Sequence, residues 1–351
     1  MQKRRPTIVM DTYGGTAAPQ GIVAAAARMS RQGVARVVLI GDVAPMQAHL
    51  SQQQYDPLML RLVQAPATYP RQADDLQAQA RAARQALPMA MEMLKSAEAD
   101  VLVTASPQEL VLELAQAHLT LLPGALTLAA AAVFPTLPRA SGDDPLALLL
   151  DVSGHRMQHA DELVAHAVLG STYSRVVTGV REPHVALLST GRNPEDGTPE
   201  IREAHQKLKH LRGIKFMGNM TATDLARGQA DVVVTDGLVG HTVRGLLEGL
   251  TTMTVEAARY AWRTKVTWQI GLRLLNQGVG MLRKVSEFQQ YGGSPVLGLQ
   301  QLVLVAHPDS AEVAFENAVK LATRCTHRNL QQELTEALAA MQPVHAVTRH
   351  G

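Results

Sequence analysis

The chain has 351 residues, of which 46% are hydrophobic and 18% are charged, a composition typical of a globular protein. Basic and acidic residues nearly balance, at 33 and 31, so the overall charge gives no reason to expect nucleic acid as a partner. The one cysteine, Cys325, excludes a disulfide within the chain, which suits a reducing cytoplasm. We see neither a signal peptide nor a spanning helix of about 20 apolar residues.

Short apolar runs alternate with helical patterns along the first half of the chain. Strands are predicted at 7–11, 35–42, 60–66 and 101–105. Continuous apolar strands that alternate with helices indicate a parallel sheet with helices on both faces. We therefore expect an α/β fold with three layers around a largely parallel sheet.

The second half repeats this pattern. Strands are predicted at 146–152, 184–190, 231–237 and 302–307, and helices at 160–178 and 198–211. The segment 134–145 is rich in Pro, Gly and Asp, and marks either an exposed loop or a boundary between two lobes of one domain. Several strands end in an acid, and ligands of open α/β sheets bind beyond the carboxyl ends of the strands. The pattern therefore predicts a small-molecule site without naming the ligand.

Two pairs of adjacent glycines stand next to predicted strands. Gly14 and Gly15 follow the first strand, where their backbone N–H groups can face an anion at the start of a helix. Gly292 and Gly293 precede the strand at 302–307 and are followed by Ser-Pro. Each pair indicates either a structural turn or a loop that approaches a ligand.

Histidines raise the question of a metal site. His155, His159 and His166 occur within sixteen residues, and a spacing of four places His155 and His159 on one face if the segment is helical. However, an H-E-x-x-H pattern is absent and no cysteine assists, so we predict no metal. His241 ends the loop "TDGLVGH" and is either an acid, base or phosphate contact, or a surface or helix-cap residue.

The segment 255–284 is unusually basic, with six basic residues and one acidic residue. Trp262, Ile270 and other apolar residues recur every four positions, and Trp268 lies in the same segment. A basic amphipathic helix with Trp is typical of a membrane interface. The alternative is a helix that packs against a dimer partner.

Six stretches, in this order, resemble the PlsX-type phosphate acyltransferase family of bacterial phospholipid synthesis. They are "DTYGG", "LDVSGHRMQHADELVAHAVLGSTYS", "HVALLSTG", "FMGNMTATDL", "ADVVVTDGLVGHTVRGLLEGL" and "QYGGSPVLGL". The resemblance implies an isocitrate-dehydrogenase-like fold, usually dimeric, without a cofactor. It implies transfer of a fatty acyl group from acyl carrier protein to inorganic phosphate. It also implies peripheral membrane attachment through a helical protrusion, at 250–287 here, with Trp262, Trp268 and Ile270 as contacts.

The resemblance also implies substrate-binding loops. The positions that match the family's loops are Asp11, Gly14, Gly15, Gly191, Asn219, Asp236, Gly237, Gly240, Gly292 and Gly293.

The chain departs from the family at polar loop positions. Glu109 stands in a loop where the family has Gly-Asn-Thr-Gly, and Asp196 replaces a lysine. His155, His159 and His241 occupy polar family positions, and we expect them to converge in the cleft, with His241 and His155 as catalytic candidates. Either the site is rebuilt for a changed donor or acceptor, or the reaction is lost and the protein is a scaffold that binds carrier protein or membrane.

Overall fold

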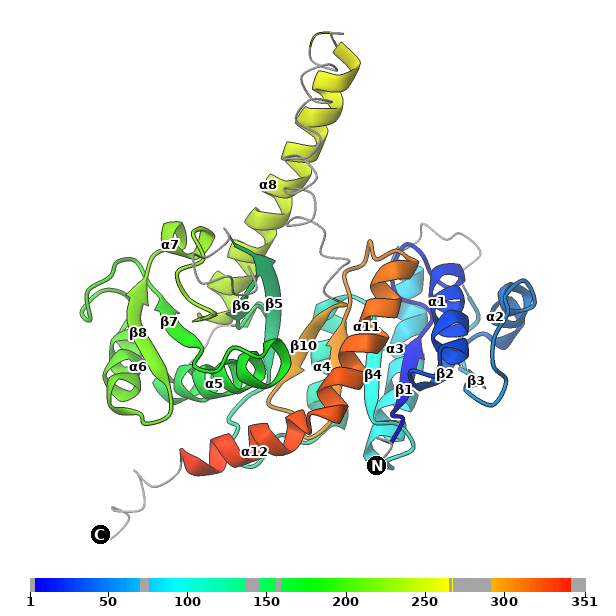
Figure 1. The fold of residues 1–351 in the computed structure, drawn as a ribbon, viewed down its shortest axis with the longest axis horizontal. Helices are drawn as coiled ribbons and strands as arrows, with labels where there is room; N and C mark the ends of the chain where they lie inside the picture. Colours follow the sequence, from blue (N-terminus) through cyan, green and yellow to red (C-terminus); the bar gives the residue numbers. More distant parts are fainter. Residues whose placement is uncertain are drawn as a thin grey trace.

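The computed structural model describes residues 4–69, 76–136, 146–155, 159–264, 267 and 292–341. The strands in these ranges form one eleven-stranded sheet in the order β3-β2-β1-β4-β11-β10-β5-β6-β9-β7-β8 (Figure 1). The strands are β1 Thr7–Asp11, β2 Arg36–Gly41, β3 Leu60–Gln64, β4 Val101–Thr104, β5 Ala129–Pro135, β6 Leu146–Leu150, β7 His184–Leu188, β8 Lys215–Met220, β9 Val232–Val234, β10 Ser294–Leu297 and β11 Leu302–Val305.

Helices follow most of the strands. They are α1 Gln20–Arg31, α2 Val43–Leu50, α3 Leu76–Lys95, α4 Gln108–His118, α5 Ala160–Tyr173, the π-helical turn η1 Ser174–Thr178, α6 Pro199–His210, α7 Ala222–Ala226, α8 Gly237–Thr264, α11 Glu312–His327 and α12 Leu330–Ala340.

The sheet consists of two parallel blocks joined by antiparallel strands. Strands β3, β2, β1, β4 and β11 are mutually parallel, and so are β6, β9, β7 and β8. Between the blocks, β10 is antiparallel to β11 and β5, and β5 is antiparallel to β6. The predicted α/β fold with a largely parallel sheet is therefore confirmed. The sequence did not indicate β5, β8 or β10.

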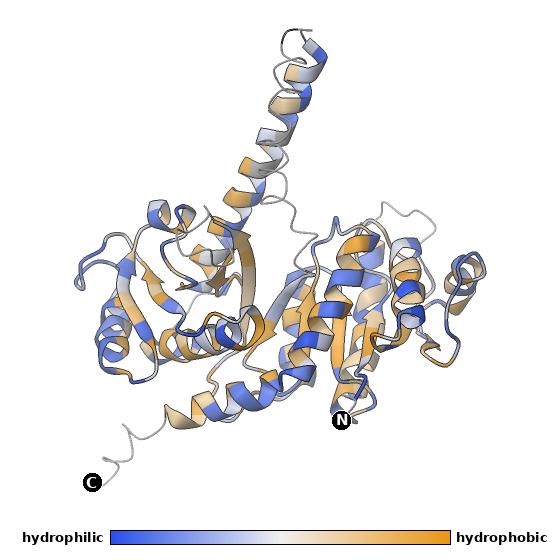
Figure 2. Ribbon diagram, viewed as in Figure 1, coloured by the Kyte–Doolittle hydropathy of each residue, from blue (hydrophilic) through white to orange (hydrophobic). Residues whose placement is uncertain are grey.

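Both faces of the sheet are covered, because successive side chains of a strand point to opposite faces. In β1, Ile8 and Met10 pack in the apolar cluster that includes Ile22 of α1 and Phe315 of α11. Val9 packs on the other face, in the cluster that includes Leu87 of α3. Figure 2 shows the strands as predominantly hydrophobic and the helices with mixed hydropathy, as expected for a three-layer structure.

Helix α8 projects away from both blocks of strands (Figure 1). Its outer part carries exposed apolar side chains, among them Leu250, Met253 and Trp262. Of the predicted protrusion at 250–287, residues 265–266 and 268–287 lie outside the described residues, and so do Trp268 and Ile270. No described helix combines the length and the apolar character needed to cross a membrane.

Most of the segment 134–145 also lies outside the described residues. The strands that flank it, β5 and β6, are antiparallel neighbours in the sheet. The division of the domain into two lobes near this segment stays a prediction.

Candidate active-site cleft

A cavity of about 500 Å³ lies beyond the carboxyl ends of β1, β4 and β11, against the first half of α8. Its size is in the range of small-molecule sites. Strands β5 and β6 and helix α8 give it an apolar wall made of Ala132, Val133, Phe134, Leu149 and Leu247. The loops, the first turn of α4 and helix α8 give it polar groups, which include Gln108, Glu109, Arg244, Glu248, His307 and Asp309.

Asp11 organises the loops beneath this cleft. It is 1% exposed, and its Oδ2 accepts hydrogen bonds from the hydroxyls of Thr104 at 2.9 Å and Ser106 at 2.6 Å. Its Oδ1 accepts from the backbone N–H of Tyr13 at 3.0 Å. Burial raises the pKa of this carboxyl, while these hydrogen bonds oppose the rise. Asp11 is not part of the cavity lining, so it acts by fixing the loops after β1 and β4.

The glycine pair after β1 allows three loops to pack backbone against backbone. A Cβ at Gly14 would overlap the backbone nitrogen of Ser106. Gly15 has φ of +90°, and a Cβ there would lie 2.8 Å from the carbonyl oxygen of Pro308. Both glycines line the cavity. They are therefore required for the close approach of the loops, and they also leave the loop backbone open to a ligand.

The second glycine pair has the same double role. Gly292 and Gly293 have φ of +75° and +109°. A Cβ at Gly292 would lie 2.5 Å from the Asn317 carbonyl of α11, and one at Gly293 would lie 2.9 Å from the Val305 carbonyl of β11. Gly293 lines the cavity. This loop is thus both a tight turn and a wall of the cleft.

The loop after β6 packs against the first turn of α8. Asp151 accepts hydrogen bonds from the backbone N–H and the hydroxyl of Ser153, at 2.8 and 2.9 Å. A Cβ at Gly240 would overlap the Asp151 carbonyl oxygen, and one at Gly237 would lie 2.5 Å from the Ser153 hydroxyl. The two glycines of "DGLVGH" therefore let α8 begin directly on this loop.

Burial and a second carboxylate perturb Asp151. Desolvation is the main cause that raises its pKa to about 6, and the nearby charge of Asp236 acts in the same direction. Asp236 itself begins α8, since its Oδ1 accepts from the N–H groups of Leu238 at 2.9 Å and Val239 at 3.3 Å. Both acids thus have structural roles at the base of α8.

Gln108 connects the two blocks of the sheet at the cleft. Its Nε2 donates to the carbonyl of Val152 at 2.8 Å, and its Oε1 accepts from Nη1 of Arg244 at 2.6 Å. Arg244 is the only Arg or Lys among the described residues that line this cavity. The sequence did not indicate Arg244, although it lies three residues beyond His241 on the same helix.

The histidine candidates lie near the cleft but do not line it. His241 is on α8, and its Nδ1 is 3.9 Å from Oε1 of Glu109, which does line the cavity. His155 is exposed, and its backbone carbonyl is close to Gly237. Neither His155 nor His159 is helical, since His159 directly precedes α5, so the condition under which the two would share a helix face is not met.

Gly191 and Asn219 belong to a separate loop cluster and are absent from the cavity lining. Nδ2 of Asn219 donates to the Asn193 carbonyl at 2.8 Å, and its Oδ1 is 2.9 Å from Nδ1 of His205. A Cβ at Gly191 would overlap the Asp196 carboxylate, which accepts from the N–H of Asn193 at 2.8 Å. The negative charge of Asp196 is therefore held within its own loop.

The described residues hold no group of three or more His, Cys, Asp or Glu that could bind a metal ion. His166 is buried, and burial lowers its pKa to about 3. Cys325 is also fully buried, and burial raises the pKa of its thiol to about 12. Neither side chain is suited to chemistry in the cleft.

Comparison with known proteins identifies the family of the chain. Residues 7–333 match a sequence model of the family described as "Fatty acid synthesis protein". The chain belongs to this family. It is 30% identical to the phosphate acyltransferase of Thermosynechococcus vestitus over 330 residues, which are 94% of each chain. It is also 30% identical to the phosphate acyltransferase of Lactococcus lactis over 337 residues, covering 95% of this chain and 99% of the relative. The resemblance seen in the sequence is confirmed.

Solved structures show that the family fold is shared more widely. A phosphotransacetylase from Streptococcus pyogenes aligns with a TM-score of 0.58 at 16% identity, over 92% of this chain and 94% of that one. A phosphotransacetylase from Staphylococcus aureus aligns with a TM-score of 0.51 at 15% identity, over 94% of each chain. At such low identity the likeness concerns the fold alone, and it agrees with the predicted α/β architecture.

Proposed function

We propose that this chain is a phosphate acyltransferase that transfers a fatty acyl group from acyl carrier protein to inorganic phosphate, in fatty-acid or phospholipid synthesis. The observation that carries the proposal is the family match over residues 7–333, together with 30% identity to two phosphate acyltransferases over nearly their whole length. A cleft with glycine loops, one cation and an apolar wall supports it.

The proposed reaction is an acyl transfer without a cofactor. An oxygen of phosphate attacks the carbonyl carbon of the thioester, so that a carbon–oxygen bond forms and the carbon–sulfur bond breaks. The thiolate of the carrier protein leaves and takes up a proton. The site must hold a phosphate dianion, stabilise the oxyanion of the tetrahedral intermediate and accept an apolar chain.

The cleft offers a group for each of these tasks. The guanidinium of Arg244 is a planar cation suited to phosphate, and Gln108 fixes its position. The loops that carry Gly14, Gly15 and Gly293 expose backbone beside it. The apolar wall from β5, β6 and α8 suits the acyl chain. The remaining family loop positions (Asp11, Gly191, Asn219, Asp236, Gly237, Gly240 and Gly292) then shape the loops that border the cleft.

We include His241 and His155 as polar groups that assist at the mouth of the cleft. The imidazole of His241 lies 3.9 Å from the carboxylate of Glu109, the group at the cleft that would repel phosphate. His155 belongs to the loop on which α8 begins. We expect a His155→Ala, His241→Ala double variant to bind phosphate more weakly than the wild type. Unchanged phosphate affinity would show that neither histidine contributes to phosphate binding.

We also propose binding partners and a cellular location for the protein. The chain would bind acyl carrier protein and form a homodimer. It would work in the cytoplasm, with peripheral membrane contact through α8, whose outer part exposes Leu250, Met253, Tyr260 and Trp262 beside Arg259 and Arg263.

A mass-spectrometric assay tests the reaction directly. The full chain is incubated with phosphate and a long-chain acyl-acyl carrier protein, and acyl phosphate is the expected product. Acyl-coenzyme A in place of the carrier-protein thioester tests whether the donor has changed. If the folded protein forms acyl phosphate from neither donor, the proposed activity is wrong and a binding role takes its place.

A further inference from the structure

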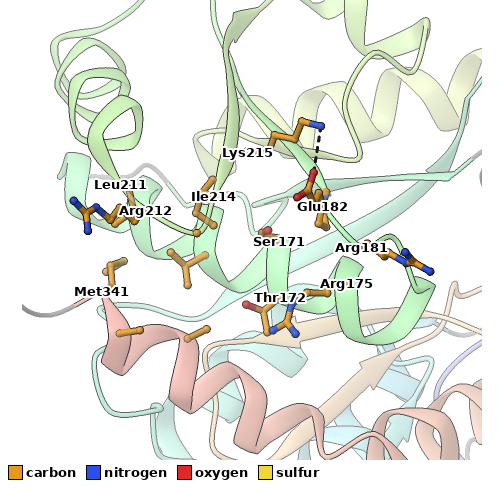
Figure 3. A pocket seen from close by; sticks show the side chains of 15 residues that line it. Ser171, Thr172, Arg175, Arg181, Glu182, Leu211, Arg212, Ile214, Lys215 and Met341 are labelled. Carbon is orange, nitrogen blue, oxygen red and sulfur yellow. Dashed lines mark ion pairs between the residues drawn. The ribbon is translucent and has the colours of Figure 1, made fainter.

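A second cavity, of about 550 Å³, lies at the amino ends of β7 and β8 (Figure 3). It is bordered by α5, by α12 and by the segments 181–183 and 211–214 that lead into the two strands. It shares no lining residue with the cleft described above. The proposed acyl transfer therefore makes no use of it.

The floor of this cavity is apolar. It is made of Val168 on α5, Leu211 and Ile214 before β8, and Ala337 and Met341 at the end of α12. Such a surface favours a ligand with an apolar part, since burying it removes apolar area from water.

Two hydroxyl groups open into the cavity from α5. Ser171 and Thr172 are only 7% and 5% exposed, yet their side chains form no hydrogen bond with any described residue. Figure 3 shows both on the same side of the pocket as Arg175. Their oxygens are not shielded from solvent, because they face the open cavity, so both hydroxyls are available to donate to a polar group of a ligand.

The rim of the cavity is basic. Arg175, Arg181, Arg212 and Lys215 line it, with Glu182 as the only acidic lining residue among those described. Lys215 pairs with Glu182 at 3.6 Å, and Arg175 pairs with Glu333 at 3.1 Å. Arg181 and Arg212 form no ion pair with a described residue. The excess of positive charge favours an anion.

We propose that this pocket binds an amphiphilic anion, with a phosphate or carboxylate head group at Ser171, Thr172 and Arg175 and a short apolar tail on the floor beside α12. The hydroxyls donate to the head-group oxygens, and the guanidinium of Arg175 adds a charge-assisted hydrogen bond. The volume suits a small ligand rather than a folded partner.

Titration calorimetry with three probes tests the proposal on the full chain. Octyl phosphate carries both parts of the predicted ligand, octyl glucoside has the tail with an uncharged head, and inorganic phosphate has the head without the tail. We expect octyl phosphate to bind more tightly than either of the others. Equal binding of octyl glucoside would contradict the anion, and equal binding of inorganic phosphate would contradict the tail.

Variants and amide exchange locate the site. In a Ser171→Ala, Thr172→Val double variant, octyl phosphate should bind at least about tenfold more weakly, because two hydrogen bonds to a charged group are lost. The control Ser51→Ala removes a hydroxyl from the end of α2 and should leave binding unchanged.

Octyl phosphate should also slow amide exchange in 168–175 and 211–215 of the wild type. Protection confined to 105–109 and 244–252 would place the probe in the reaction cleft and overturn the proposal.

Discussion

Oε1 of Gln108 accepts a 2.6 Å hydrogen bond from Nη1 of Arg244, although the two residues are 136 positions apart. The other end of the same amide donates to the carbonyl of Val152 at 2.8 Å. One side chain thus ties the first turn of α4 to the loop after β6 and to α8. This arrangement holds a cation in the wall of the same cavity that the glycine loops line.

Replacing Arg244 by Gln should lower kcat/KM for phosphate by about ten- to a hundredfold, because a charge-assisted hydrogen bond to phosphate is lost. Steady-state assays of acyl phosphate formation measure this. Arg84→Gln is the matched control, since Arg84 is an exposed arginine that pairs with Glu113 at 2.6 Å, and neither lines the cleft. Equal activity of the two variants would mean that Arg244 does not contact phosphate.

Glu109 places a carboxylate in the lining of a cavity that is proposed to hold a dianion. Its side chain is 60% exposed, so solvent weakens the repulsion. We therefore expect Glu109→Gln to lower KM for phosphate by only about two- to fivefold, with little change in kcat. Glu113→Gln, one turn further along α4, is the control and should leave KM as it is. A higher KM in Glu109→Gln would show that this carboxylate assists binding.

The loops should also respond to a single methyl group. Gly14→Ala brings a Cβ against the backbone nitrogen of Ser106, and backbone cannot move aside as a flexible side chain can. We expect the free energy of unfolding to fall by at least about 2 kcal/mol, as measured by urea denaturation. Gly249→Ala has no atom within 4 Å of the added Cβ and should stabilise α8 by up to about 1 kcal/mol. Similar stability of both variants would contradict the observed packing of the loops.

The strands with continuous apolar runs could be predicted from the sequence, because burial on both faces requires such runs. The strand β5 could not, since "AAAAVFP" has four alanines, which favour helices over strands. Its conformation depends on pairing with β6 and β10, which local sequence does not reveal. The same holds for β8, "KFMGNM", in which only the last two residues are buried.

The glycines of the cleft could be found from the sequence, because a turn and a close approach both demand the same residue type. The other residues that line the cleft with those glycines could not be found from the sequence. Arg244 lines the cleft because α8 begins on the loop after β6, and Gln108 at the start of α4 hydrogen-bonds to it. Gly191 and Asn219 show the converse, since matching loop positions did not bring them to the cavity.

Asp151 should make the stability of the protein depend on pH. Its pKa is raised from 3.8 to about 6, mainly by burial, so the folded state binds a proton that the unfolded state has already lost between these values. The contribution of this group is therefore fully present below about pH 4 and is lost as the pH rises through about 6. We therefore compare the unfolding free energy of Asp151→Asn with that of the wild type at two pH values. The value for the variant minus that for the wild type should be up to about 3 kcal/mol larger at pH 8 than at pH 4. A difference independent of pH in urea denaturation would show that the carboxyl titrates normally.

We expect the exposed apolar side of α8 to contact the membrane. Leu246, Leu250 and Met253 are spaced by four and three residues, so they lie on one side of the helix, and they are 63%, 46% and 60% exposed. If this side enters a membrane interface, Leu250→Glu with Met253→Glu should abolish cosedimentation with vesicles that contain anionic lipid. The matched control, Arg259→Gln with Arg263→Gln, removes two positive charges from exposed positions on the other side of the helix and should weaken binding only in part, through lost attraction that salt screens. Because the two variants carry the same net charge, equal loss of binding would show that electrostatic attraction alone holds the protein at the vesicle, and that the apolar side of α8 is not inserted.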